Sequence, residues 1–323
     1  MNNVVSVDIV MITYNQEKYV AQAIESVLQQ KCDFPFLLII NDDCSTDNTP
    51  NICKEYAYKY PNLILFNQNK SNVGLMRNYK ISLEACQSKY VAILEGDDYW
   101  IDDCKLKKQA KILESNKDVG LVHSARHSLL DETNKISEPL KQTTIFNLLN
   151  QGNVFEQLLI SNFISPLTVL FRNELIKDKL DFNYFIENKL KTLDYALWLL
   201  ITYKSKVVYM KESTAVYRVR RDSISNKKSM DSMENFLITS RLTCKYFINK
   251  FKVKTISEKK IDLIYNNILF SHSLLYGDYE FSRKYSQLIE VLSLKDYCKF
   301  IISKSKMSVR IYSKCLNFII KYY

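Results

Sequence analysis

Three carboxylates stand together at the end of an apolar segment. The segment "VAILEGDDYW" begins at Val91, and its four apolar residues lead directly into Glu95, Gly96, Asp97 and Asp98. Ionised carboxylates at this spacing repel one another, and placing them after a buried strand gives the fold no benefit. A divalent cation would remove the repulsion, and Mn²⁺ or Mg²⁺ suits ligands that are all oxygen. The spacing therefore predicts carboxylates that hold a metal ion. If a phosphate group binds to this protein, that ion would be the charge that neutralises it.

The few glycines in the chain exclude the common nucleotide-binding loops. A G-x-G-x-x-G fingerprint or a P-loop needs closely spaced glycines, and the five glycines here are scattered, at Gly74, Gly96, Gly120, Gly152 and Gly277. A dehydrogenase or a P-loop kinase is therefore excluded. A zinc site is not indicated either, because the eight cysteines form no C-x-x-C pair and the chain has only three histidines.

Strands and helices alternate in the first third of the sequence. Short apolar runs rich in β-branched residues predict strands, at Val7–Ile12, Phe36–Ile40, Leu63–Phe66 and Val91–Leu94. Amphipathic spacing predicts a helix after each strand, at about 20–28, 50–60, 75–87 and 103–114, with Asn15 as the N-cap of the first. This order predicts an α/β fold with a mostly parallel sheet and helices on both faces.

Polar segments follow three of these strands. "TYNQE" follows the first strand, "NDDCSTDNT" the second and "EGDDYW" the fourth. In a parallel sheet, ligands bind beyond the carboxyl ends of the strands. The three segments are therefore expected to converge on one rim, where a bound cation would hold the acidic side chains together.

The rest of the chain is predicted to change from mixed structure to helix. Short strands are predicted at Gly120–His123, Thr168–Phe171, Lys206–Tyr209 and Thr214–Val219, with a helix at 193–203. Residues 230–323 contain no proline and one glycine, and their helical spacing predicts several helices. The best boundary between the two parts lies near residue 226.

The positive charge is concentrated in the second part. Residues 227–323 contain 18 Lys and Arg and 8 Asp and Glu, which accounts for the whole net charge of +10. The balanced first part argues against a nucleic-acid-binding module. No signal peptide is apparent, the longest apolar run is too short to span a bilayer, and the scattered thiols fit a reducing compartment. These features predict a cytoplasmic protein, with peripheral binding to the inner face of the membrane as an alternative for its basic part.

Four segments in a fixed order resemble the glycosyltransferase family 2 pattern on the GT-A fold. They are "DIVMITYNQEKYVAQAIESVLQQ", "LIINDDCSTDNT", "NVGLMRNYKISLEACQSKYVAILEGDDYW" and "KLKKQ". The resemblance covers about residues 6–225. It implies a GT-A domain at 1–226, with a nucleotide-sugar-binding half at 1–118 and an acceptor-binding half at 119–226, followed by a basic helical region at 227–323.

The resemblance also implies which residues bind the nucleotide-sugar, and UDP is the expected nucleotide. Asp42 is at the position that accepts a hydrogen bond from the uracil N3–H, a role that suits a carboxylate. Ser45 or Asp47 would then cap the next helix. Arg77 lies in the segment near the donor, although a surface helix arginine is an equal alternative. The other implied donor-binding residues are Thr13, Tyr14, Asn15, Glu17, Glu95, Gly96, Asp97 and Arg220.

Metal binding and catalysis are likewise implied by the resemblance. The "EGDD" segment corresponds to the family's D-x-D element, with Glu95 where an Asp is common and Asp97 as the principal ligand of Mn²⁺ or Mg²⁺. Asp98 is either a second ligand or a helix cap. Asp194 in "KTLDYALW" is expected to be the general base of inverting transfer, with a helix-dipole role as the alternative.

The segment "AVYRVRRDSIS" resembles the family's closing segment. Arg220 stands where many members have a histidine, and a guanidinium there would pair with the diphosphate in place of binding metal. Arg218 and Arg221 are expected to face solvent instead.

Together these features predict a metal-dependent inverting hexosyltransferase. It would use a nucleotide-sugar donor and a saccharide or lipid-linked acceptor in the synthesis of a surface polysaccharide. A nucleotidyltransferase is a weaker alternative, because "TYNQEKY" lacks the glycine-rich loop that such an enzyme needs. A catalytically inactive GT-A-like scaffold that binds a membrane or a polyanion is the alternative outside enzymes.

The last 29 residues are expected to form a basic helix with an apolar face. Residues 295–323 carry seven lysines and arginines against the single acid Asp296, interleaved with apolar side chains. Such a helix either lies in an anionic membrane interface or packs on the catalytic domain.

Overall fold

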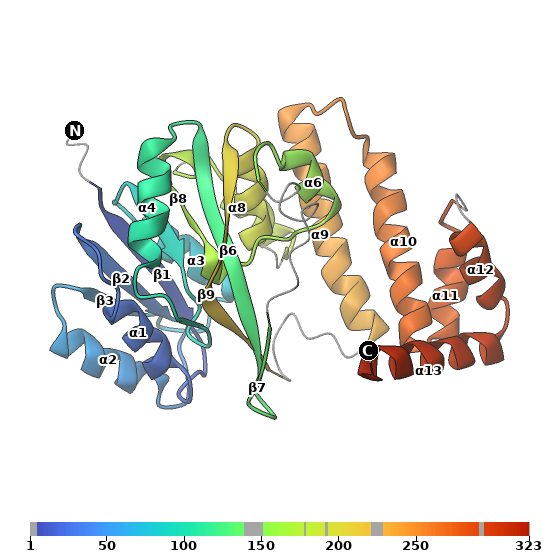
Figure 1. The fold of residues 1–323 in the computed structure, drawn as a ribbon, viewed down its shortest axis with the longest axis horizontal. Helices are drawn as coiled ribbons and strands as arrows, with labels where there is room; N and C mark the ends of the chain where they lie inside the picture. The colour runs from blue at the N-terminus through green and yellow to red at the C-terminus, as the bar shows by residue number, and fades with distance from the viewer. Residues whose placement is uncertain are drawn as a thin grey trace. The chain divides into compact units, whose positions relative to one another are not determined.

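The computed structural model describes residues 5–138, 151–177, 179–190, 193–220, 229–290 and 294–322. The chain divides into two compact units, residues 1–223 and residues 224–323. Figure 1 shows that the first unit combines a sheet with helices and that the described part of the second unit is helical. The assignment of donor and acceptor functions to residues 1–118 and 119–226 stays a prediction.

Four parallel strands form the predicted first half of the sheet. They are hydrogen-bonded in the order β3-β2-β1-β4, with β1 at Val7–Thr13, β2 at Phe36–Asp42, β3 at Ile64–Gln68 and β4 at Tyr90–Ile93. The connecting helices are α1 at Val20–Leu28, α2 at Thr49–Lys59 and α3 at Leu75–Glu84. Thr13 pairs with Asp42 in the register of β1 and β2, so the loops that follow these two strands start side by side.

The second half of the sheet is mixed. The order continues β4-β8-β6-β9-β5, with β8 antiparallel to both of its neighbours and β9 parallel to β6. The bounds are β5 at Tyr99–Trp100, β6 at Val119–Leu130, β7 at Lys135–Ser137, β8 at Leu170–Arg172 and β9 at Lys206–Val219. β5 pairs antiparallel with β9, and β7 pairs with β6.

The four strand predictions in this half need correction. Lys206–Tyr209 and Thr214–Val219 are one strand, which stays paired with β6 through register shifts at Ser124, Ala125 and Arg126. The predicted short strand at Gly120–His123 is the beginning of a strand of 12 residues. Pro166–Thr168 form a 3-10 helix before β8. β9 ends at Val219, and its last residues lie beside the acids that follow β4, because Arg218 N donates to Asp98 Oδ1.

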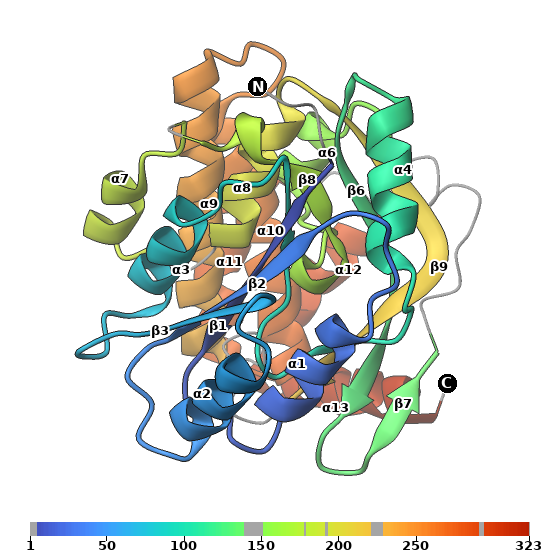
Figure 2. The ribbon, with the colours of Figure 1, turned by 90° about the vertical axis from the view of Figure 1, so that its left-hand side faces the viewer.

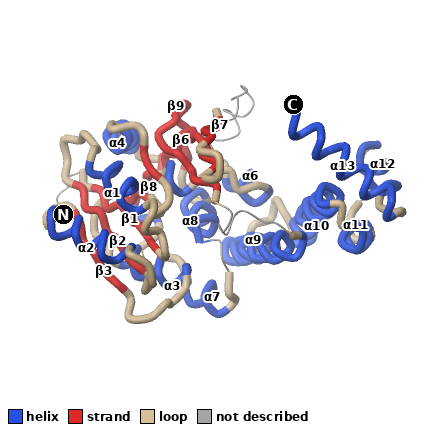
Figure 3. Tube along the Cα trace, turned by 90° about the horizontal axis from the view of Figure 1, so that it is seen from below, coloured by secondary structure: helices blue, strands red, loops and turns tan. Residues whose placement is uncertain are grey.

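Helices cover both faces of the sheet, as predicted. Val7, Ile9 and Met11 of β1 share one apolar cluster with residues of α1, of α2 and of α4, which spans Lys105–Ser115. Figures 2 and 3 show α3, α7 and α8 on the side of the sheet opposite α4. The bounds of the remaining helices of this unit are α6 at Phe155–Ile160, α7 at Phe182–Glu187 and α8 at Leu193–Thr202.

A buried lysine joins α4 to the strand that follows the acidic segment. Lys105 has no exposed surface. Its Nζ donates to Gln109 Oε1 at 2.8 Å and to the Val169 carbonyl at 3.1 Å. The same atom lies 4.4 Å from the centre of the Trp100 ring, a cation–π distance. Burial lowers the pKa of Lys105 to about 7, opposed by the nearby charge of Asp102.

This lysine is expected to make folding stability depend on pH. An unfolded lysine has a pKa near 10.5 and the folded Lys105 has one of about 7, so the unfolded chain binds more protons between these values. The free energy of unfolding should therefore rise with pH across that window, by up to about 1.4 kcal/mol per pH unit from this group. Urea unfolding at pH 7.5 and at 9.5 should show this rise in the wild type and a smaller one in Lys105→Met.

The control for this prediction is Lys107→Met. Lys107 is on the same helix but is exposed beside Asp33, so its removal should leave the pH dependence of stability unchanged. Equal slopes for Lys105→Met and the wild type would contradict the prediction.

Five helices make up the second unit as far as it is described. They are α9 at Met230–Phe251, α10 at Glu258–Tyr276, α11 at Tyr279–Ser286, α12 at Leu294–Ile302 and α13 at Lys306–Tyr322. Side chains of Ser229, Ser257 and Asp278 cap three of them by accepting from backbone N–H groups. A separate apolar cluster includes Leu269 and Phe270 of α10 and Val309 of α13. No helix within the described ranges is both long and apolar enough to cross a membrane.

The predicted single helix over 295–323 is two helices. α12 ends at Ile302 and α13 begins at Lys306, and Val309 of α13 is fully buried in the cluster of the second unit. Part of the apolar face therefore packs within its own unit. Ile301, Met307 and Ile311 remain at least half exposed.

Candidate active site

Backbone and side-chain hydrogen bonds join the loops that follow β1 and β2. Asn15 N donates to Ser45 Oγ at 2.9 Å, and Asn15 Oδ1 accepts from Thr46 N at 2.8 Å. Asn15 has a φ of 52°, a left-handed conformation that asparagine tolerates better than most residues. Its predicted role as the N-cap of α1 is wrong, because α1 begins at Val20 with Tyr19 at the cap position.

Glu17 and Asp47 also connect these loops. Glu17 N donates to Asp47 Oδ2 at 3.0 Å, and Glu17 Oε2 accepts from Asn48 N at 2.9 Å. Both carboxylates lie at the N-terminus of α2, where negative charge is favourable. These contacts position the rim of the sheet, and the donor-binding role of Glu17 stays a prediction.

Asp42 is buried at the end of β2 and accepts several hydrogen bonds. Its donors are the Thr13 hydroxyl at 3.1 Å, the Ser45 hydroxyl and backbone N–H at 2.5 and 2.9 Å, and the Gln68 amide at 3.2 Å. Its side chain has no exposed surface. The predicted contact with uracil would require the ligand to replace one of these donors, so the assignment stays a prediction. Tyr14 beside it is exposed.

Asp43 has a positioning role that sequence reasoning missed. Its two carboxylate oxygens accept from Val73 N at 2.8 Å and Gly74 N at 2.9 Å, at the start of α3. Asn69 after β3 donates to the same carboxylate at 2.9 Å. The second acid of "NDDCS" therefore fixes α3 against the sheet.

The three acids after β4 come together as predicted. One carboxylate oxygen from each of Glu95, Asp97 and Asp98 lies within 4.8 Å of the others. Gly96 between them is in close contact with the loop after β1. A Cβ atom at this position would lie 2.4 Å from Gln16 Oε1 and 2.7 Å from Thr13 Cγ2, so any larger residue would require these two side chains to move.

Burial controls the electrostatics of these acids. It raises the pKa of Glu95 to about 7, assisted by the charge of Asp97 and opposed by a 2.6 Å hydrogen bond from the Tyr79 hydroxyl. Burial also raises the pKa of Asp98, assisted by Asp97. The pKa of Asp97 is raised by burial and opposed by the Arg220 guanidinium. Closely spaced oxygen ligands of this kind, with Asp98 buried and Glu95 and Asp97 half-buried, fit Mg²⁺ or Mn²⁺.

Arg218 and Arg220 reach the acids from the end of β9. Arg218 N donates to Asp98 Oδ1 at 2.8 Å, and Arg218 Nε donates to the Asp97 carbonyl at 2.9 Å. Its guanidinium also pairs with Asp131 at 3.3 Å. Arg218 is only 7% exposed, so the expectation that it faces solvent is wrong. Arg221 lies outside the described residues.

Arg220 forms an ion pair with the expected metal ligand. Arg220 Nη1 lies 3.0 Å from Asp97 Oδ2. The guanidinium carbons of Arg218 and Arg220 lie 4.5 and 5.1 Å from the centre of the Tyr19 ring. The Tyr19 hydroxyl donates to Asp131 Oδ2 at 2.7 Å. One aromatic ring therefore supports both arginines beside the acidic group.

Asp194 lies in the first turn of α8 and belongs to the same electrostatic site. Burial raises its pKa, opposed by hydrogen bonds from the Tyr195 backbone and the Asn162 side chain. The charge of Asp194 contributes to the raised pKa values of Glu95 and Tyr79. The charge of Asp194 therefore acts on Glu95 although the two residues are far apart in sequence, and the role of Asp194 as the general base stays a prediction.

Arg77 lies on the exposed side of α3, and the residue of this helix that contacts the acidic group is Tyr79. Arg77 lines a groove of about 350 Å³ together with Lys80 of the same helix and Ile186 of α7. Tyr79, which contacts Glu95, lies on the buried side of α3. The proximity of Arg77 to a nucleotide-sugar stays a prediction.

Comparison with known proteins identifies the family. Residues 8–179 match the family model described as "Glycosyl transferase family 2". The chain is 33% identical over 212 residues to an uncharacterized protein of Mycobacterium tuberculosis. The aligned region covers 65% of this chain but only 58% of the length of that protein. It is 28% identical over 247 residues to the minor teichoic acid biosynthesis protein GgaB of Bacillus subtilis, covering 73% of this chain and 25% of GgaB.

A solved structure shares the fold. S. aureus TarS in complex with UDP-GlcNAc superposes with a TM-score of 0.60 at 16% identity, over 97% of this chain and 91% of the TarS chain. This likeness supports the predicted GT-A architecture with helices at the C-terminal end. Because the family model matches more than half of the residues, the chain belongs to glycosyl transferase family 2.

Proposed function

We propose that this glycosyltransferase moves a hexosyl group from a UDP-sugar to a saccharide or lipid-linked hydroxyl, with inversion and with the help of Mn²⁺ or Mg²⁺. The observation that carries the proposal is the grouping of Glu95, Asp97 and Asp98 in one electrostatic site with Asp194. The reaction needs carboxylates that bind the metal ion and a carboxylate that accepts the proton of the acceptor hydroxyl.

Asp97 and Asp98 are the residues that would hold the metal ion. A bound divalent ion supplies positive charge that offsets the negative charge on the departing diphosphate. Glu95, held by the Tyr79 hydroxyl, shapes the position of that pair. Arg220 is close enough to Asp97 to add a second positive group beside the diphosphate.

Asp194 is the proposed general base. As the acceptor oxygen forms its bond to the anomeric carbon, the bond from that carbon to the diphosphate oxygen breaks, and the hydroxyl proton passes to the Asp194 carboxylate. A raised pKa makes a carboxylate a stronger base, and burial supplies that shift here. Attack from the side opposite the leaving group inverts the anomeric configuration.

The acceptor class is proposed from the relatives. GgaB carries the name of a teichoic acid biosynthesis protein, and TarS was solved with UDP-GlcNAc. The name of GgaB favours an acceptor within a cell-surface polymer or its lipid-linked precursor. The ligand of TarS favours a UDP-sugar donor. The inactive-scaffold alternative would keep the fold but bind no donor.

The deciding experiment is a donor panel. The purified protein is incubated with individual UDP-, GDP- and TDP-sugars in Mn²⁺, in Mg²⁺ or in EDTA, and release of the nucleoside diphosphate is measured. We expect turnover with a UDP-sugar that EDTA abolishes. Absence of binding and turnover with every donor would reject the enzyme in favour of the scaffold, and turnover in EDTA would reject the metal.

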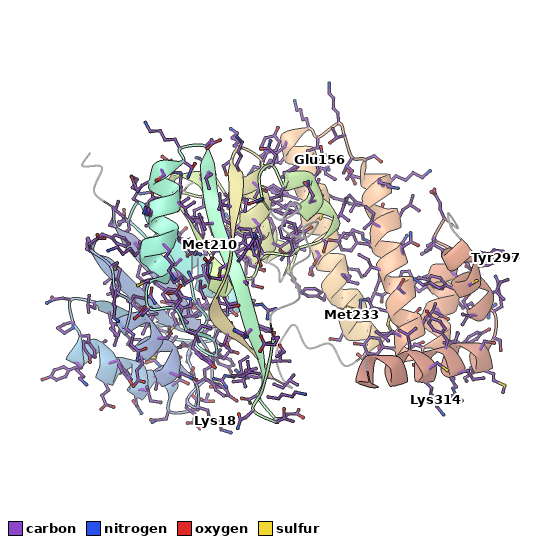
Figure 4. The ribbon with its side chains drawn as sticks, viewed as in Figure 1. Lys18, Glu156, Met210, Met233, Tyr297 and Lys314 are labelled. Atoms are coloured by element: carbon purple, nitrogen blue, oxygen red, sulfur yellow. The ribbon has the colours of Figure 1, made fainter. Side chains whose placement is uncertain are left out.

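We further propose that the second unit docks on an anionic membrane, where a lipid-linked acceptor would be found. The docking surface consists of exposed Ile301, Met307 and Ile311 with exposed Lys304, Arg310 and Lys314. Figure 4 labels Lys314 on α13 and Tyr297, another exposed side chain, on α12. Apolar side chains among cations suit an interface that attracts each cation by about 1 kcal/mol.

The membrane proposal predicts salt-sensitive sedimentation. The full chain should sediment with phosphatidylglycerol-containing liposomes at low salt and be released at high salt, because surface attraction is screened. Met307→Ser combined with Ile311→Ser should sediment much less. Tyr58→Ser is the control, since Tyr58 is 90% exposed on the first unit. Failure of the wild type to sediment at low salt, or undiminished sedimentation of the double variant, would contradict membrane docking.

A further inference from the structure

Each acid of the candidate metal site has one oxygen engaged by an internal donor. Glu95 accepts from the Tyr79 hydroxyl at 2.6 Å, and Asp98 accepts from the Arg218 backbone N–H at 2.8 Å. Asp97 is paired with Arg220 at 3.0 Å. The first two donors are neutral and fixed, one on α3 and one in the backbone of β9. The third is a full positive charge on a long side chain just beyond the end of β9.

Arg220 and a divalent cation therefore compete for the same carboxylate. Both satisfy the negative charge of Asp97, and two cations in so small a space repel each other. The Arg220 and Asp97 side chains are only 14% and 16% exposed, so water screens their attraction poorly. The Tyr19 ring, 5.1 Å from the Arg220 guanidinium carbon, holds the arginine in this position.

We propose that Arg220 is an internal latch that occupies the metal position on Asp97 until a nucleoside diphosphate binds. The diphosphate offers the guanidinium a bidentate partner of higher charge, so Arg220 moves from Asp97 to the diphosphate and Asp97 becomes free for the metal ion. Metal and nucleotide then bind cooperatively, and each strengthens the other by the same factor. The proposal rests on the assignment of a nucleoside diphosphate donor above.

Without nucleotide, the latch lowers the affinity for the metal ion below the affinity that the same acids would have if Arg220 were absent. A latch that is closed for nine-tenths of the time lowers the apparent affinity about tenfold. Arg220→Gln removes the competing charge, so this variant should bind Mn²⁺ alone about tenfold more tightly than the wild type. The gain in Mn²⁺ affinity on adding UDP should shrink by a similar factor.

The measurement is a titration of free Mn²⁺ followed by electron paramagnetic resonance, with and without UDP. Binding that persists in Asp97→Ala is subtracted as background from other acids. Lys18→Gln is the matched control, because Lys18 is exposed on the first unit and its removal changes the net charge equally (Figure 4). Lys18→Gln should leave the affinity for Mn²⁺ unchanged.

Tyr19 provides an independent second test. Tyr19→Leu removes the ring under the guanidinium and should also tighten binding of Mn²⁺ alone, whereas Tyr19→Phe keeps the ring and should not.

The latch is overturned if Arg220→Gln binds Mn²⁺ no more tightly than the wild type. It is also overturned if Lys18→Gln gains as much Mn²⁺ affinity as Arg220→Gln. If wild-type protein does not bind UDP, the proposed donor fails, but the comparison made with Mn²⁺ alone still decides the latch.

Discussion

Asp97→Ala is expected to lose metal-dependent binding of UDP and to retain only background sugar transfer. Asp97 is the acid at the centre of the group that would hold the cation, and a metal ion supplies several kcal/mol of stabilisation to a developing charge. A loss of at least about 10³-fold in transfer follows from that magnitude. Calorimetric titration of UDP in Mn²⁺ and a transfer assay measure the two effects.

Asp103→Ala is the control for this prediction. Asp102, Asp103 and Cys104 form a second group whose ligand atoms lie within 4.8 Å of one another. Asp103 is paired with Lys31 at 2.6 Å and its side chain is 46% exposed, and Asp102 is paired with Lys108 at 2.6 Å. This group has no assigned part in donor binding. Asp103→Ala should therefore leave UDP binding in Mn²⁺ unchanged. Wild-type UDP affinity in a folded Asp97→Ala protein would show that the metal is held elsewhere.

The parts of the site that follow consecutive strands could be predicted from the sequence. A β-α-β order fixes a parallel arrangement, and parallel strands place their carboxyl ends on one rim. The acids after β4 are indeed close to the loop after β1, because Gly96 has no Cβ to collide with Gln16 and Thr13. Local apolar patterning was sufficient for this inference.

Contacts from distant segments could not be predicted in the same way. The Arg218 backbone bonds to Asp98 across 120 residues of sequence, and this contact depends on β9 being one long strand paired with β6. Short-range patterning divided that strand in two because it cannot detect register shifts. Tyr79 and Tyr19 were missed for a related reason, since a tyrosine on a helix gives no sign of which carboxylate it will meet.

The role of Asn15 could not be predicted from the residues next to it in the sequence. An asparagine before an amphipathic helix favours an N-cap, but this one adopts a left-handed conformation and bonds to the loop after β2. The competing partners Ser45 and Thr46 lie about 30 positions away. Tertiary contacts therefore decided the role of a residue whose local sequence suggested a different one.

Asp194→Asn is expected to lose transfer while keeping the donor site. An amide cannot take the proton of the acceptor hydroxyl, and a positioned general base contributes about 10²–10⁴-fold to rate. Asparagine preserves the size of the side chain at the start of α8, and its carbonyl oxygen can still accept from Asn162. We therefore expect UDP affinity in Mn²⁺ to match the wild type while transfer falls by about 10²–10⁴-fold.

The pH dependence of the wild type gives a second readout of the same residue. Burial raises the pKa of Asp194, and a base acts only when it is deprotonated, so transfer should fall as the pH is lowered through that raised value. Asp194→Asn should lose the part of this acidic limb that Asp194 contributes, and keep the part that comes from protonation of Glu95, whose pKa is raised to about 7. Asp181→Asn is the matched control, because Asp181 caps α7 by accepting from Tyr184 N at 3.2 Å but has no assigned part in the reaction.

The two readouts separate a base from a structural acid. An acid that only stabilised the start of α8 through the helix dipole would cost about 0.3–1 kcal/mol of stability when neutralised, and transfer by the folded protein would keep its acidic limb. Transfer by Asp194→Asn within about tenfold of the wild type, or about 1.4 kcal/mol, would place the base elsewhere. Glu95 would then be the first alternative, because it is half-buried, its pKa is raised to about 7, and the charge of Asp194 acts on it.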